Sequence, residues 1–181
     1  MKKLLAIVAL TAAVFVSTPT WAQQQDSVKK MPPKERKRMS PKASVTETMK
    51  NGTVISINYS QPYLKNRTIG KDIAPFEKVW RTGADEATTF EVSKDVKLEN
   101  MLLPAGKYSL YTIPGEKEWT IIFNKSWNQW GTVYKQDLDQ LRVKVKPENS
   151  NTSTEMLTYL ISKAGDVSIN WGKVKVEFDI D

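Results

Sequence analysis

The sequence predicts an all-β protein, an antiparallel β-sandwich of about eight to ten short strands with little helix. Three observations support this fold class. After about Ser44, apolar residues recur at alternate positions in several stretches, pairs of turn-forming residues separate these stretches, and no long segment has the spacing of an amphipathic helix.

The strand pattern is clearest in three segments, residues 53–59, 141–145 and 174–180, where apolar and polar side chains alternate. Less regular strands are expected at residues 88–92, 107–113, 119–123 and 154–161. Asn51-Gly52 predicts a hairpin with a type I′ turn, because both central positions of that turn have positive φ. Residues 132–141 are the one segment expected to hold a short helix.

The first 22 residues have the layout of a secretory signal peptide. A basic start precedes an uncharged apolar stretch at residues 4–16, and small residues precede a cleavage site after Ala22. The apolar stretch is shorter than the ~20 residues that a transmembrane helix needs. The sequence therefore predicts a soluble exported protein, periplasmic or extracellular, with no transmembrane segment.

Residues 23–39 are expected to form a basic disordered linker. Residues 23–38 carry six basic and two acidic side chains, a net charge of +4 out of +7 for the whole chain. With so few apolar side chains, this segment cannot offset the entropy of ordering. Its basic residues 29–38 could alternatively contact an anionic envelope surface. Because the charge is concentrated in a tail, and the chain is expected to be exported, nucleic acid is not an expected partner.

Two residue types are missing, and each absence removes classes of function. The chain has no Cys and no His, which removes disulfides, the common zinc sites and Ser-His-Asp catalysis. Asp137 and Asp139 lack the turn glycine and terminal glutamate of a calcium loop. No metal and no cofactor is expected, and an enzyme is less expected than a binding protein.

Four motifs resemble one known family: VWRTGADEAT at 79–88, AGKYSLYTIPG at 105–115, EWTIIFN at 118–124 and NQWG at 128–131. At these residues the chain resembles the secreted, Bacteroidetes-type bacterial proteins catalogued as domain of unknown function 2911. The resemblance implies export and a single domain over residues 40–181, and it brings no established activity. Asp85 stands where the family commonly has Asn, and Gln61 where it commonly has Arg, so a ligand bound there would differ.

The strongest candidate for binding is the segment from Trp127 to Gly131. Trp127 and Trp130 are suited to stacking on sugar rings, and Gln129 between them is suited to reading hydroxyl groups. Asn124 would add to this site if it converges on it, as would the nearby Tyr134. The alternative is that one or both tryptophans cap the sandwich, with Gly131 at positive φ.

Arg81, Asp85 and Glu86 form a second polar group with two interpretations. They could be an ion-pair cluster that shapes a loop and lines the same site. Alternatively, the two carboxylates could do the acid–base chemistry of a hydrolase. Neighbours on a strand point to opposite faces, so this second interpretation requires the backbone to bend there.

The leading hypothesis from the sequence is non-enzymatic binding of a carbohydrate or other small polar ligand. A carboxylate-dependent hydrolase is one alternative. The other is a cell-envelope scaffold or protein-interaction module, in which the same tryptophans form a protein interface.

Overall fold

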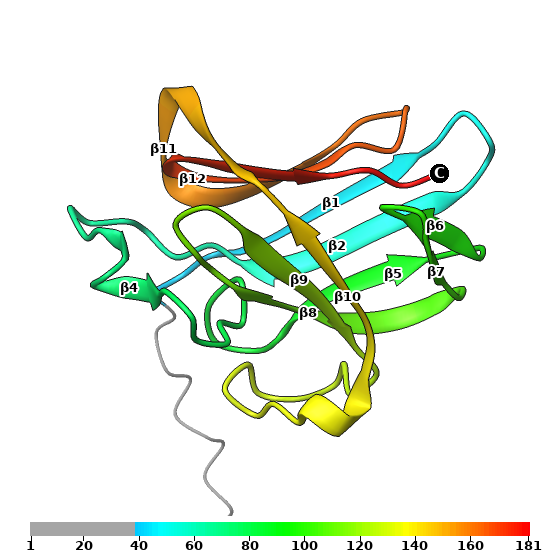
Figure 1. Cartoon of the computed structure of the whole chain (residues 1–181), viewed down its shortest axis with the longest axis horizontal. Coiled ribbons are helices and arrows are strands. Elements are labelled where there is room, and N and C mark those ends of the chain that lie inside the picture. Colours follow the sequence, from blue (N-terminus) through cyan, green and yellow to red (C-terminus); the bar gives the residue numbers. More distant parts are fainter. Residues whose placement is uncertain (1–38) are drawn as a thin grey trace, which may run out of the picture. The chain divides into compact units, whose positions relative to one another are not determined.

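The computed structural model describes residues 39–181, and most of them form β-strands (Figure 1). The strands are β1 (Lys42–Thr48), β2 (Val54–Ser60), β3 (Ile69–Gly70), β4 (Ile73–Pro75), β5 (Thr88–Val92), β6 (Val96–Leu98), β7 (Met101–Leu103), β8 (Gly106–Ile113), β9 (Trp119–Asn124), β10 (Asp139–Val145), β11 (Pro147–Ile161) and β12 (Val167–Phe178). The all-β prediction is confirmed. The strands outnumber the expected eight to ten because β3, β4, β6 and β7 have only two or three residues each.

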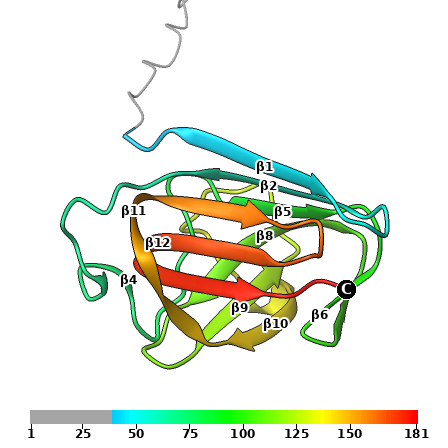
Figure 2. The same ribbon diagram turned by 90° about the horizontal axis from the view of Figure 1, so that it is seen from above.

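Two layers make the fold sandwich-like. The larger layer is an antiparallel sheet in the order β1-β2-β5-β8-β9-β10. The smaller layer is the antiparallel pair β11-β12, which lies across one face of the large sheet (Figure 2). The large sheet therefore has an inner face toward β11-β12 and an outer face away from them.

Aromatic side chains join the two layers in a common core. Phe178 of β12 packs edge-on against Phe123 of β9, with ring centroids 6.0 Å apart. Tyr59 of β2 and Tyr159 of β11 meet at 4.6 Å in the same way. Each such pair contributes about 0.5–1.5 kcal/mol beyond the burial of apolar area. In a chain without disulfides, this packing is the main source of stability.

The predicted hairpin joins β1 to β2, but its turn differs from the predicted type. Gly52 has a φ of 77°, whereas Asn51 does not have positive φ. The Gly52 N–H donates to the carbonyl of Met49 at 2.9 Å, and the Asn51 side chain accepts the N–H of Thr53 at 2.9 Å. The type I′ prediction is therefore wrong. The Asn51 side chain stabilises the turn through its hydrogen bond to the Thr53 N–H, and Gly52 is the turn residue that adopts the left-handed conformation.

The segment expected to hold a short helix contains one 3₁₀ turn, Gln136–Leu138, and β10 begins directly after it. The predicted signal peptide and all but the last residue of the predicted linker lie outside the described residues. Among residues 39–181, no helix has the length and apolar character needed to cross a membrane.

Candidate functional site

A cleft of about 780 Å³ lies on the outer face of the large sheet. Its floor includes Ser44, Asn58 and Thr89, which stand directly opposite one another on β1, β2 and β5. Their strand neighbours Ile57 and Phe90 are fully buried. Because side chains alternate along a strand, burial of these neighbours on the inner face directs the polar side chains outward. The floor is therefore a row of short hydrogen-bonding groups.

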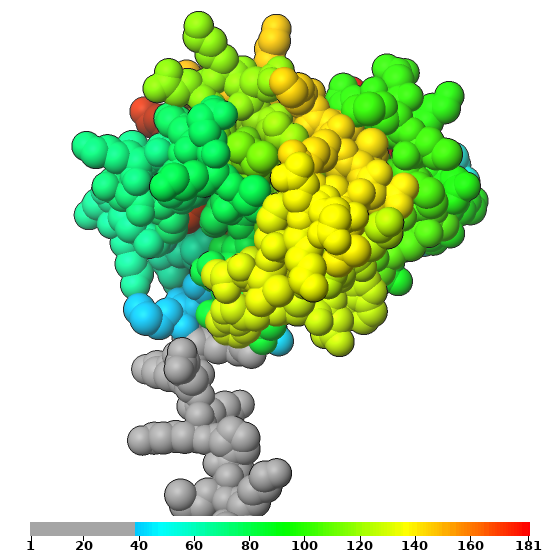
Figure 3. Space-filling view, turned by 60° about the horizontal axis from the view of Figure 1, so that its bottom comes forward, coloured from blue at the N-terminus to red at the C-terminus, as the bar shows by residue number. Residues whose placement is uncertain are grey.

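One wall of the cleft comes from the loop between β9 and the 3₁₀ turn that precedes β10, residues 125–135. This loop forms a raised lobe beside the start of β1 (Figure 3, yellow and blue). Its two tryptophans line the cleft, and Trp127 and Trp130 are 41% and 49% exposed. Both side chains therefore remain at the surface and do not cap the sandwich. The buried tryptophans of the described chain are Trp80, Trp119 and Trp171.

The loop is attached along residues 85–87. The Ala87 N–H donates to the carbonyl of Gln129 at 3.1 Å, and the Gly131 N–H donates to the carbonyl of Asp85 at 3.0 Å. A Cβ at position 131 would lie 2.3 Å from the Arg81 Cδ and 2.8 Å from the Asp85 carbonyl oxygen. The alternative in which the tryptophans cap the sandwich implied a positive φ at Gly131, and the φ of Gly131 is not positive. This residue is glycine because the chain passes too close to its neighbours for a side chain.

Gln129 lines the cleft and also fixes the loop from inside. Its amide nitrogen donates to the Tyr111 hydroxyl at 3.0 Å, and its amide oxygen accepts the Ser126 hydroxyl at 2.7 Å. The Tyr111 hydroxyl in turn donates to the carbonyl of Val133 at 2.8 Å. Gln129 thus holds the tryptophan loop in place, because its amide is engaged by Ser126 of the loop and by Tyr111 of β8.

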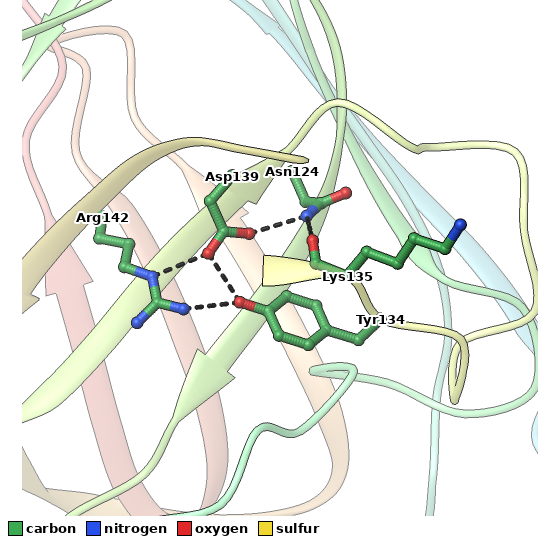
Figure 4. A network of polar contacts seen from close by, with 5 residues as sticks. All are labelled: Asn124, Tyr134, Lys135, Asp139 and Arg142. Carbon is green, nitrogen blue, oxygen red and sulfur yellow. Dashed lines mark hydrogen bonds and ion pairs between the residues drawn. The ribbon is translucent and has the colours of Figure 1, made fainter. Parts of the chain in front are cut away.

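A second group of polar contacts anchors the end of the loop (Figure 4). The Asp139 carboxylate accepts the Tyr134 hydroxyl at 2.6 Å and the Arg142 Nε at 2.8 Å. Arg142 also donates to the Tyr134 hydroxyl at 2.7 Å. The Asp139 side chain is only 9% exposed. These charge-assisted bonds tie the loop to β10.

Asn124, a predicted site residue, lies in this anchor and does not line the cleft. It is fully buried, and its amide nitrogen donates to Asp139 at 2.7 Å and to the Lys135 carbonyl at 2.8 Å. The Asp139 carboxylate is thus engaged by three side chains. Within residues 39–181 no group of three or more acidic side chains is placed to hold a metal ion.

The contact between Tyr134 and Asp139 predicts that the folded protein loses stability at alkaline pH. Burial, followed by the hydrogen bond to Asp139 and the charge of that carboxylate, raises the pKa of Tyr134 from 10.0 to about 12. A folded-state pKa above the unfolded value stabilises the fold fully below pH 10, and this contribution is lost as pH rises toward 12. We expect urea unfolding to show this decline, and Tyr134→Phe to make it shallower. An equal decline in both proteins would contradict the assignment.

The three residues of the second polar group separate. The backbone does bend, with a φ of 47° at Thr82 and 59° at Asp85. Glu86 lines the cleft, whereas Asp85 and Arg81 do not. Among residues 39–181 no ion pair joins Arg81 to either carboxylate. The stem of Arg81 instead packs beneath Gly131. The paired carboxylates that a hydrolase would use are therefore not both in the cleft.

Sequence reasoning missed the floor and two cations at the rim. The Lys107 Nζ lies 4.7 Å from the centre of the Trp127 ring and 3.2 Å from a carboxylate oxygen of Glu91. The Lys42 Nζ lies 4.0 Å from a carboxylate oxygen of Glu86. A signal was present in the sequence: Ser44, Asn58 and Thr89 are polar residues at positions that alternate with apolar residues along β1, β2 and β5.

Comparisons with known proteins give one family match. The model of a family described as "Protein of unknown function (DUF2911)" matches residues 40–180. Neither the curated proteins nor the solved structures include a significant match to the chain.

Proposed function

The chain belongs to this family of proteins of unknown function, DUF2911, and we propose that it is a non-enzymatic domain that binds a carbohydrate or another small polar ligand. One observation carries the proposal: two exposed tryptophans form the wall of a cleft whose floor is a row of hydroxyl and amide side chains. Indole faces stack on the C–H faces of sugar rings, while hydroxyl and amide groups bind their hydroxyls.

The size of the cleft supports the proposal. Small-molecule sites usually enclose about 300–1,000 Å³, and this cleft has about 780 Å³. Gln129 and the anchor around Asp139 hold the tryptophan loop in place before any ligand arrives. Such preorganisation reduces the entropy cost of binding.

The predicted signal peptide fits this proposal, because export would bring the protein to the glycans of the cell envelope or its surroundings. The scaffold alternative has one observation in its favour: Val133, on the same loop, is 47% exposed. Together with the two tryptophans it could form an apolar protein interface. The hydrolase alternative has less support, since Glu86 is the only carboxylate among the described residues that line the cleft.

A thermal-shift screen tests the proposal. The protein without its predicted signal peptide is heated with envelope and dietary glycans and with small polar metabolites. A ligand at about 100 times its Kd stabilises the folded state by about 2.7 kcal/mol, which is a measurable shift for a domain of this size. We expect at least one glycan to raise the melting temperature. If no glycan or metabolite raises the melting temperature, the proposal fails. The next experiment would then be affinity purification of a protein partner, which tests the scaffold alternative.

A further inference from the structure

We infer that the ligand of this cleft is an acidic saccharide, and that Lys107 binds its carboxylate next to the ring stacked on Trp127. The inference rests on the proposed function and specifies its ligand. It starts from the position of a cation beside the stacking platform, a feature that binding of neutral sugars does not require.

Lys107 lies where a ligand on Trp127 would meet it. Its Nζ is 4.7 Å from the centre of the Trp127 ring, within the range of a cation–π contact. The side chain rises from β8 and lines the cleft together with the ring. A sugar stacked on the remaining surface of Trp127 would therefore bring its ring substituents close to the ammonium group.

The ammonium group keeps donors for a ligand. Glu91, directly opposite Lys107 on β5, accepts from it at 3.2 Å. The Glu91 side chain is 51% exposed, so this ion pair is solvated and weak. An ammonium group has three N–H donors, and Glu91 engages one of them. Glu91 thus orients Lys107 and leaves two donors for an anion.

A second cation stands at the opposite rim. Lys42 is on β1, three strand positions from β8 in the sheet, a separation of about 14 Å between strands. Its side chain is 66% exposed, and its distance of 4.0 Å to Glu86 marks a loose pair. The floor residues Asn58 and Thr89 lie between the two lysine-bearing strands. A saccharide lying across the floor would meet a lysine near each end.

A uronate, a sugar ring that carries a carboxylate, satisfies all three parts of the cleft. Its C–H face suits the indoles, its hydroxyls suit the floor, and its carboxylate suits Lys107. Within residues 39–181, Lys42 and Lys107 are the basic residues that line the cleft, and Glu86 is the acidic one. A strongly cationic ligand would meet the two ammonium groups unfavourably.

Calorimetric titration of the protein without its predicted signal peptide tests this inference. The probes are an oligogalacturonate and the same oligomer with its carboxylates methyl-esterified. We expect the ester to bind about tenfold more weakly, because a hydrogen bond to a charged group is worth more than a neutral one. Affinity for the acid should also fall as salt is added.

Lysine variants test whether Lys107 and Lys42 cause the preference for the acid over the ester. Lys107→Met should reduce the preference for the acid over the ester to within about twofold, and Lys42→Met should reduce it partly. Lys97→Met is the matched control, since Lys97 is an exposed lysine on β6 and does not line the cleft. It should leave the preference unchanged. Urea unfolding of each variant confirms that the fold is kept.

The outcomes separate the two proposals. Equal affinity for acid and ester, or a preference that survives in Lys107→Met, overturns the acidic-saccharide inference while the binding function stands. Binding of neutral oligosaccharides without binding of the uronate would also overturn the acidic-saccharide inference and leave the binding function standing. If neither probe nor any neutral oligosaccharide binds, the acidic-saccharide inference fails, and the proposed binding function fails with it when no small polar metabolite binds in the thermal-shift screen either.

Discussion

Replacing both cleft tryptophans, Trp127→Ala with Trp130→Ala, is expected to weaken glycan binding about 100-fold and to change the free energy of unfolding by less than about 1 kcal/mol. The two effects differ because both side chains are 41–49% exposed, so they contribute contact area to a ligand and little to the core. Calorimetric titration with a glycan from the thermal-shift screen, together with urea unfolding, measures the two quantities.

Val133→Ala is the matched control, because Val133 is 47% exposed on the same loop but does not line the cleft. We expect it to keep full affinity for the glycan. Retained binding in the double tryptophan variant would contradict the proposed site. A large loss of stability in that variant would show instead that the indoles serve the fold.

The second large effect is expected from Asp139→Ala, which should lower the free energy of unfolding by about 3 kcal/mol. The substitution removes the common partner of Tyr134, Arg142 and Asn124 (Figure 4). Breaking a buried ion pair costs about 3–5 kcal/mol. We expect a cost at the lower end of this range, because the Arg142 side chain is 35% exposed. Urea unfolding measures the change.

Asp137→Ala provides the control within the same short segment. Asp137 is exposed and lies in the 3₁₀ turn just before Asp139, so its loss should cost less than about 0.5 kcal/mol. Equal effects at the two positions would show that the anchor does not stabilise the loop.

The strands could be predicted because apolar and polar side chains alternate along consecutive residues of the chain. The expected strand at 88–92 coincides with β5, and the one at 107–113 falls within β8. At 53–59, Ile55, Ile57 and Tyr59 lie in the core as the alternation predicts. In these segments a local pattern of burial is sufficient to identify the strand and its inner face.

The cleft was only partly predictable, because it depends on which strands become neighbours. Trp127 and Trp130 could be recognised from their spacing within one loop. Asn58 and Thr89, in contrast, belong to strands that pair across a long connection, and strand order is not encoded in either segment alone. Asn124 lies in the anchor because β10 returns beside β9 and brings Asp139 to it.

The most direct test of the binding site is an NMR titration of the protein without its predicted signal peptide, using a glycan from the screen and observing the indole N–H signals. We expect the signals of Trp127 and Trp130 to shift on addition of the glycan. Those of the buried Trp80, Trp119 and Trp171 should stay in place. Unchanged Trp127 and Trp130 signals, with shifts located elsewhere in the protein, would contradict the assignment of the cleft.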